Sequence, residues 1–348
     1  MHKKYFLNNK KKSFAQNDYE LKNNSYYRPY NQCKSTQFHV VAIQWFESIK
    51  VQTKESTQNK YWNTLELYVL PDLGKYMINE ITDQIIEEHC SQLLKEGGVR
   101  KAGLSPKSVG FALSLVRSIL KFADRRGEDV ICDGTTIRIS HERSEMRIFS
   151  KSEQKVLCEY LRQNINGCNI GILMCLFTGL RIGEICALRW EDISFDDKCI
   201  MVRRTMQRIQ DRDGNKKTKI VITSPKSACS VRAIPIPESL LDILVLYKCT
   251  KKGYVLTNSA STFIEPRVLQ NRFKNTLIKI GIKQLNFHAL RHTFATRCIE
   301  LGFDIKCLSE ILGHASVNIT MNRYVHPPMS LKYENMQKLS RFGFDEEL

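Results

Sequence analysis

Apolar residues recur along the chain at two different spacings, and these spacings predict two kinds of secondary structure. Between residues 38 and 126 they recur every three or four positions, which is typical of helices with one buried face. We expect one helix on the stripe Phe38, Val41, Trp45 and three more over residues 57–69, 83–95 and 106–126. Pro71 is expected to end the second of them. These four helices predict a small helical domain, residues 35–128.

A second domain is expected over residues 147–348, after a loop-like linker at 129–146 that follows neither spacing. It begins with helices predicted at 152–163 and 169–178 and another starting near Arg181. The spacing then shifts towards two, which predicts strands over 198–210, 217–223 and 231–236. Helices return after Pro237. The predicted fold class is therefore mainly α with a small antiparallel β-sheet, an α+β protein of two domains.

The charge of the chain indicates a polyanionic partner. Its 348 residues carry 53 Lys+Arg against 36 Asp+Glu, a formal charge of +17. Nucleic acid is the first partner to test and an acidic membrane surface the second, while a basic protein with neither role stays open. Residues 1–34 contain eight Lys/Arg and two Asp/Glu and lack a regular period, so we expect a flexible basic tail. It either contacts phosphates or is a solvated extension.

Cysteine spacing argues against both metal binding and disulfides. The chain has 12 cysteines, none in a C-x-x-C pair, and most have apolar neighbours, as Cys175 and Cys186 do. Such cysteines are typical of the cores of proteins in a reducing compartment. The longest apolar run is too short to cross a bilayer, and the N-terminus lacks a signal-peptide pattern. We therefore expect a cytoplasmic protein without a membrane partner.

Four segments of the second domain carry residues suited to phosphate chemistry. They are T-G-L-R-I-G-E, P-K-S, H-A-L-R-H-T and L-G-H followed by a tyrosine, with the candidate residues Arg181, Glu184, Lys226, His288, Arg291, His314 and Tyr324. Arginine guanidinium groups match phosphate oxygens in pairs. Glu184, three positions after Arg181 on a helix, is placed to orient it. Alone, the first segment also fits a surface ion pair of Arg181 with Glu184, and the second fits a solubilising surface lysine at Lys226.

The same segments contain a nucleophile but no metal-binding pattern. His288 and Arg291 share a helical face, whereas His292 lies just off it and is interpreted as a structural histidine. A tyrosine attacks poorly until it loses its proton or cations stabilise the phenolate. The set holds neither a carboxylate pair nor metal-ligand spacing, so we predict no metal and no cofactor. It suits attack of Tyr324 on a phosphodiester.

At these residues the chain resembles the tyrosine recombinases, or phage-type integrases. The motifs occur in the family's order and at similar distances, and residues 38–126 resemble its core-binding domain in helix number and position. The resemblance implies that Arg181, Arg291 and the two histidines surround the scissile phosphate. It also implies that Lys226 protonates the 5′-oxygen and that Tyr324 joins the 3′-phosphate. His288 is in addition a candidate acceptor of the tyrosyl proton.

The resemblance implies site-specific DNA recombination. The N-terminal extension and the gap from His314 to Tyr324, which resembles that of many mobile-element integrases, favour integration and excision of a mobile element. The implied partners are double-stranded DNA at specific recombination sites, three further copies in a homotetramer, and an excision factor or DNA-bending protein. Chromosome-dimer resolution, type IB topoisomerase activity and a catalytically inactive architectural role remain alternatives. In the first domain, the basic stripe of Arg117, Lys121 and Arg125 is predicted to contact DNA, although a solvated face has the same pattern.

Overall fold

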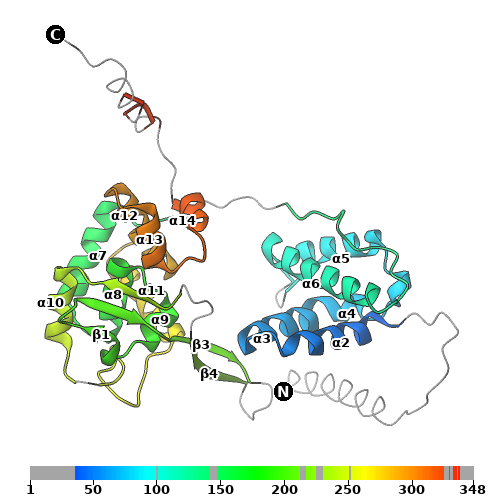
Figure 1. Cartoon of the computed structure of the whole chain (residues 1–348), viewed down its shortest axis with the longest axis horizontal. Coiled ribbons are helices and arrows are strands. Elements are labelled where there is room, and N and C mark those ends of the chain that lie inside the picture. Colours follow the sequence, from blue (N-terminus) through cyan, green and yellow to red (C-terminus); the bar gives the residue numbers. More distant parts are fainter. Residues whose placement is uncertain are drawn as a thin grey trace. The chain divides into compact units, whose positions relative to one another are not determined.

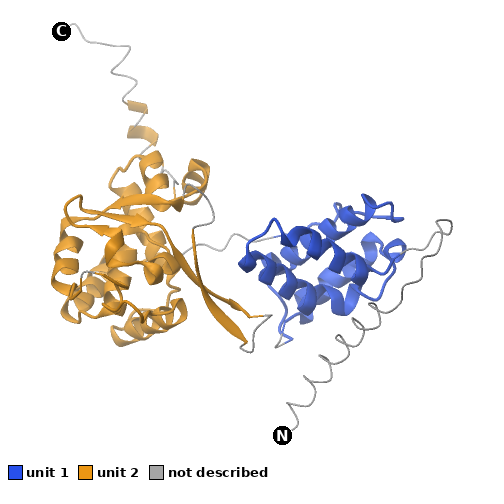
Figure 2. Cartoon of the chain, turned by 60° about the horizontal axis from the view of Figure 1, so that its bottom comes forward, with its two compact units in different colours: residues 1–141 blue, residues 142–348 orange. Residues whose placement is uncertain are grey.

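The chain forms two compact units that divide after residue 141 (Figure 2). The computed structural model describes residues 36–98, 101–140, 147–211, 217–224, 230–250, 252–324, 329, 332–334 and 336–337. The predicted fold class is confirmed, since these residues form mainly helices with small antiparallel sheets. The basic tail at 1–34 lies outside the described residues.

Unit 1 is a helical bundle around one apolar core (Figure 1). Its elements are α2 (Phe38–Lys50), α3 (Glu55–Thr64), the π-helical segment η1 (Leu65–Val69), α4 (Leu70–Leu73), the 3₁₀ segment η2 (Ile78–Glu80), α5 (Asp83–Glu96) and α6 (Pro106–Asp124). Local signals set two of the helix starts. The side chains of Thr82 and Ser105 accept hydrogen bonds from the backbone N–H groups of Ile85 and Ser108, at the first turns of α5 and α6.

The prediction that Pro71 ends the second helix was wrong. Helical backbone continues through Pro71 to Leu73, after a π-helical turn over Leu65–Val69. Proline has no N–H, so it disrupts an α-helix unless it lies in a first turn, where no N–H bond is needed. The π-turn changes the hydrogen-bonding pattern directly before α4 and leaves Pro71 in that first turn.

Part of the segment expected to be a linker packs onto unit 1. Ile137 is 4% exposed and belongs to the apolar core of the bundle, and Val130, Cys132 and Ile139 pack against that core. The guanidinium of Arg117 on α6 donates to the carbonyl oxygens of Gly134, at 2.9 Å, and Ile137, at 2.5 Å. One predicted DNA contact therefore also holds the end of unit 1 in place, while Lys121 and Arg125 are exposed.

Up to Tyr324, the described residues of unit 2 form eight α-helices and five strands, and residues 329, 332–334 and 336–337 are also helical. The helices are α7 (Lys151–Gln163), α8 (Gly167–Thr178), α9 (Ile182–Ala187), α10 (Glu238–Tyr247), α11 (Pro266–Lys279), α12 (His288–Glu300), α13 (Ile305–Leu312) and α14 (Val317–Tyr324). The strands are β1 (Ile193–Ser194), β2 (Cys199–Val202), β3 (Thr205–Gln210), β4 (Thr218–Thr223) and β5 (Arg232–Pro235). A short 3₁₀ segment, η3 (Trp190–Asp192), precedes β1.

The strands form two antiparallel sheets, β1-β2-β5 and β3-β4. The sequence predicted one strand over 198–210, but the structure divides it into β2 and β3, which belong to different sheets. Consequently β4 pairs with β3 while β5 pairs with β2. Strands β4 and β5, which lie on either side of residue 226 in the sequence, therefore belong to different sheets. Lys226 itself lies outside the described residues.

The core of unit 2 surrounds α8, which is buried on nearly every side and contacts α7, α9, α10, α11 and α12. Residues Ile170, Leu173 and Leu176 of this helix are 0–2% exposed. A second apolar cluster joins α12, α13 and α14 and includes Leu308, Leu312 and Tyr324. Within the described ranges, every helix is too short or too polar to cross a membrane.

Candidate active site

Arg181 follows a sharp turn at the end of the buried helix α8. Gly179 adopts the left-handed conformation, with φ of 66°, and a Cβ there would lie 2.6 Å from Cδ1 of Phe294. Glycine is therefore required both for the backbone angle and for the close approach of α12. The turn places Arg181 at the N-cap of α9, where its side chain is partly exposed.

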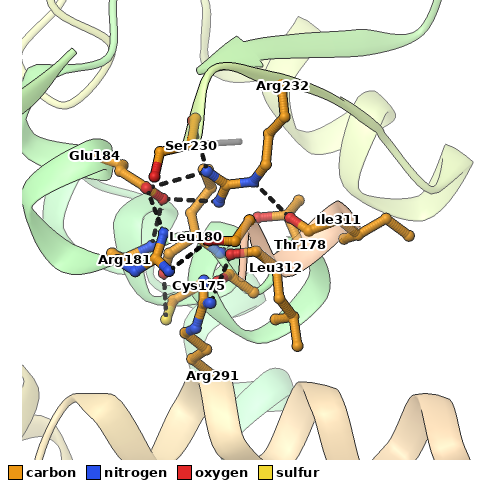
Figure 3. A network of polar contacts seen from close by, with 12 residues as sticks. Cys175, Thr178, Leu180, Arg181, Glu184, Ser230, Arg232, Arg291, Ile311 and Leu312 are labelled. Carbon is orange, nitrogen blue, oxygen red and sulfur yellow. Dashed lines mark hydrogen bonds and ion pairs between the residues drawn. The ribbon is translucent and has the colours of Figure 1, made fainter. Parts of the chain in front are cut away.

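Glu184 is the predicted orienting carboxylate, and it holds two arginines instead of one (Figure 3). It is 4% exposed. Its Oε1 accepts from Arg181 Nη1 at 2.9 Å, and Arg232 donates to Oε1 at 3.1 Å and to Oε2 at 2.9 Å. Burial raises the pKa of this carboxyl, but the hydrogen bonds and charge of Arg232, followed by the charge of Arg181, outweigh burial and hold the pKa below its usual value.

Sequence reasoning missed Arg232. It lies on β5, where its side chain is 6% exposed, and its Nε donates to the carbonyl oxygen of Ile311 at 2.6 Å. Its contacts thus join β5 to Glu184 and to α13. A signal was available, because Arg232 and Ile234 alternate with exposed residues and share the buried face of the strand. An arginine at an inward strand position requires a buried partner.

Arg181 and Arg291 are held together by the end of α13. Arg291 Nη2 donates to Leu312 O at 2.6 Å, and Arg181 Nη2 donates to Gly313 O at 3.0 Å. The carbonyl end of a helix carries partial negative charge, which favours two neighbouring cations. Arg291 is 1% exposed and also donates to Gly179 O at 2.5 Å. Burial, together with the nearby charge of Arg181, lowers the pKa of Arg291 to about 9.

His314 is fixed as a neutral ring by two contacts. Arg291 Nη2 lies 3.1 Å from His314 Nε2, and an arginine only donates, so Nε2 is the acceptor. The proton is therefore on Nδ1, which lies 2.8 Å from Thr320 Oγ1. Burial and then the charges of Arg291 and Arg181 lower the pKa of His314 to about 4.

Tyr324 is buried in the same cluster, 7% exposed, at the end of α14. Its Oη lies 2.7 Å from His292 Nδ1, and its ring lies parallel to that of His314, with centroids 6.4 Å apart. Burial raises the pKa of Tyr324, while the charges of Arg291, Arg323 and Arg181 oppose that rise. The nucleophile candidate is thus surrounded by cations and contacts a histidine directly.

His288 lies one ring further from the tyrosine. Its imidazole meets that of His292 edge-on, with centroids 4.4 Å apart and planes at 85°. Burial and then the charges of Arg291, Arg323 and Arg181 lower the pKa of His288 to about 4. Burial, followed by the charges of His288, Arg323 and Arg291, lowers the pKa of His292 to about 3.

The structure therefore brings five of the six predicted catalytic residues together in unit 2, in what we call the active-site cluster: Arg181, His288, Arg291, His314 and Tyr324. Lys226 lies outside the described residues. The stripe of Arg117, Lys121 and Arg125 belongs to unit 1. Groups of three or more His, Cys, Asp or Glu suited to a metal ion are absent from the part of the chain that the structure describes.

A buried tyrosine that contacts a histidine and interacts with the charges of Arg291 and Arg181, on this fold, points to the class of tyrosine-type DNA strand-transfer enzymes. The chain belongs to the phage integrase family, whose model matches residues 147–330, and the family's N-terminal SAM-like domain matches residues 38–94. A XerC-like tyrosine recombinase of Caldanaerobacter subterraneus subsp. tengcongensis is 29% identical over 81% of this chain and 76% of its own.

Two groups of solved structures share the fold. The integrase of the Tn1549 transposon, in complex with transposon right end DNA, matches with a TM-score of 0.73 and 18% identity over 88% of this chain and 100% of its own. A lambda integrase tetramer bound to a Holliday junction matches with a TM-score of 0.60 and 15% identity over 87% of this chain and 85% of its own. Both matches include residues from each of the two units, given this coverage.

Proposed function

We propose that this protein is a site-specific DNA recombinase that cuts and rejoins strands through a covalent 3′-phosphotyrosine intermediate. The observation that carries the proposal is the placement of Tyr324 within the cluster that holds Arg181 and Arg291, in a single chain. Because the nucleophile already lies beside its cations, the chain needs only a scissile phosphate to complete the reacting group.

The two arginines supply the electrostatic part of the reaction. In-line attack adds negative charge to the non-bridging phosphoryl oxygens, and fixed guanidinium donors stabilise that charge where it develops. Glu184 and the α13 carbonyls hold Arg181 and Arg291 before DNA arrives, so little reorganisation is needed. By analogy with oxyanion-hole donors, loss of either guanidinium should slow cleavage by about 100- to 1,000-fold.

The bond formed by Tyr324 makes the reaction reversible. The phenol oxygen bonds to phosphorus as the bond to the 5′-oxygen breaks, and Lys226 is the proposed donor of a proton to that oxygen. The phosphotyrosine conserves the energy of the broken linkage. A 5′-hydroxyl from a second duplex can then attack it, which exchanges strands without ATP.

We further propose that the substrate is the end of a mobile element and that four copies assemble on two sites. The fold shared with an integrase that was solved on transposon right end DNA supports the first part. The fold shared with a lambda integrase tetramer on a Holliday junction supports the second. An excision factor or DNA-bending protein and a cytoplasmic location complete the proposal. Direct repeats flanking the gene would support it, and their absence would count against it.

Trapping of the covalent intermediate tests the chemistry. The full-length chain is mixed with labelled duplex from the element's end that carries a nick near the cleavage site, so that the released fragment diffuses away. We expect a protein–DNA band that resists denaturation and that Tyr324→Phe abolishes. A band that persists in Tyr324→Phe would show that another residue attacks. Binding without any covalent band would favour an architectural protein.

The same protein distinguishes recombination from topoisomerase activity. A recombinase requires its cognate site and exchanges strands between two duplexes. We expect supercoiled plasmid without such a site to stay supercoiled, and plasmid with two sites to yield recombinant products. Relaxation of the site-free plasmid by a monomer would instead identify the alternative enzyme class.

A further inference from the structure

The Tyr324 hydroxyl contacts a histidine outside the set that sequence reasoning assigned to catalysis. The atom is His292 Nδ1, 2.7 Å from Oη, and both side chains are buried, at 5% and 7% exposure. The two rings have centroids 5.6 Å apart and planes tilted by 49°, a separation that suits a hydrogen bond from a phenol to an imidazole nitrogen. His288, the acceptor expected from the sequence, contacts the ring of His292 instead.

We propose that His292 accepts the phenolic proton of Tyr324 during strand cleavage. The proposal rests on the proposed function and adds a catalytic residue to it, since His292 touches the reacting oxygen. His288 then packs against the base, and His314 accepts a hydrogen bond from Arg291 and so helps to position that arginine.

The step balances without an added reagent. The phenol oxygen forms a bond to phosphorus while its proton moves to His292 Nδ1, giving an imidazolium. The bond from phosphorus to the 5′-oxygen breaks, and Lys226 gives that oxygen its proton. In the reverse step the incoming 5′-hydroxyl returns a proton to Lys226, and the His292 imidazolium returns one to the departing phenolate.

The surroundings keep His292 in the form that can accept a proton. The titratable and charged groups that face it are His288 and Arg291 on α12, Arg323 on α14, and His314 after α13. Burial, together with the charges of these groups, disfavours an imidazolium in the free protein, so the ring is neutral at pH 7. A bound phosphate offsets the arginines and restores basicity to the ring when the substrate is in place.

A single-turnover experiment with two leaving groups tests the assignment. The nicked duplex described above is made with the natural 5′-oxygen and with a 5′-bridging sulfur, which leaves without a proton donor. His292→Asn should slow cleavage of both substrates by about 100- to 1,000-fold, with DNA binding unchanged. Lys226→Ala should cleave the substrate with the natural 5′-oxygen slowly and should cleave the 5′-bridging sulfur substrate at close to the normal rate. His288→Asn, one helical turn away, is the matched control, and its cleavage rate should fall less than that of His292→Asn.

Fluorination of Tyr324 separates proton transfer from mere support of the tyrosine. Fluorotyrosine loses its proton more readily, so it should partly restore the cleavage rate of His292→Asn. If His292 merely positions the tyrosine, fluorination should leave the cleavage rate of His292→Asn slow. In the otherwise unchanged protein, the acidic limb of the pH–rate profile should keep its position on fluorination, because the limb belongs to His292. This second measurement does not depend on the fold of any His292 variant.

Each contrary result overturns the proposal. Cleavage by a folded His292→Asn variant at or above the normal rate would show that the contact of His292 with Tyr324 only holds the tyrosine in its resting position. An acidic limb that moves with fluorination would show that Tyr324 ionises without His292. A larger loss in His288→Asn would make His288 the acceptor. Failure of the unmodified protein to form any covalent band would refute the proposed function itself, together with this inference.

Discussion

Replacement of Arg232 by methionine should destabilise unit 2 and slow cleavage, although Arg232 is not one of the residues proposed to touch the phosphate. The substitution keeps the apolar stem and removes the guanidinium. Glu184 then loses its two hydrogen bonds from Arg232, at 3.1 and 2.9 Å, and the carbonyl of Ile311 loses a donor at 2.6 Å.

The size of the effect follows from burial. The two side chains are 6% and 4% exposed, and removal of one partner from a buried ion pair costs about 3–5 kcal/mol. Glu184 retains Arg181 and the backbone N–H of residue 181, so the lower end of that range, about 3 kcal/mol, is expected. For a unit of this size, the loss corresponds to a fall of about 6–12 °C in Tm.

The stability assay is urea unfolding of the full chain, monitored by a signal from unit 2. The activity assay is the rate of cleavage of the nicked substrate. Arg208→Met is the matched control, because Arg208 lies on β3 and pairs with Glu265 at the surface, with 43% and 26% exposure. It should cost less than about 1 kcal/mol. The double variant Arg232→Met, Glu184→Leu should regain part of the lost stability, since neither member of the buried Glu184–Arg232 pair is then left without the other.

Stability and activity should separate in that double variant. Cleavage should stay slow because Arg181 no longer has the carboxylate that orients it. If Arg232→Met costs no more than the surface control, or if the two substitutions add without coupling, the buried network does not support the site as argued. Normal cleavage by the double variant would likewise refute the orienting role of Glu184.

Three further results are expected. Gly179→Ala should lose at least about 2 kcal/mol in urea unfolding, because the left-handed backbone angle disfavours alanine and its Cβ would press on Phe294. Acidification from pH 6.5 towards 4 should lower the Tm of unit 2: the folded pKa values of His292 and His314, about 3 and 4, lie below the unfolded value near 6.5, so protons bind the unfolded chain first. An unchanged Tm would contradict this. Lys121→Ala should reduce the log–log salt slope of DNA binding by about 1 if that exposed lysine contacts a phosphate, and a constant slope would exclude the contact.

Helix starts were predictable from the sequence because their signals are local. Thr82 and Ser150 are of the residue types that favour helix starts, and their side chains accept hydrogen bonds from the backbone N–H groups of Ile85 and Glu153. The division between β2 and β3 was not predictable from spacing, since both continue one alternating stretch. Which strand pairs with which depends on distant segments, here β5 and β4.

In the candidate site, too, the residues with local sequence signals were predictable and the residues that depend on contacts between distant segments were not. Arg181, Arg291 and Tyr324 could be predicted because attack on a phosphate requires these residue types and they lie in recognisable motifs. The structure brings them together. Arg232 and the contact of His292 were missed because they depend on packing across the unit: β5 against α9, and α14 against α12. Helical-face reasoning set His292 aside because it considered only the residues of α12 itself.

The charges of the cluster fit the transition state better than the substrate. Three buried or partly buried arginines, Arg181, Arg232 and Arg291, share one carboxylate, that of Glu184, so two positive charges remain uncompensated by side chains. A phosphodiester brings one negative charge, and attack by tyrosine raises it to two once the phenolic proton has left. Burial and this excess charge lower the pKa values of His288 and His314 in the free protein, and the charge is balanced only as the new bond forms. The buried network around Glu184 thus holds that excess charge in place, because relaxation of either arginine away from its carbonyl partners would leave those partners unsatisfied.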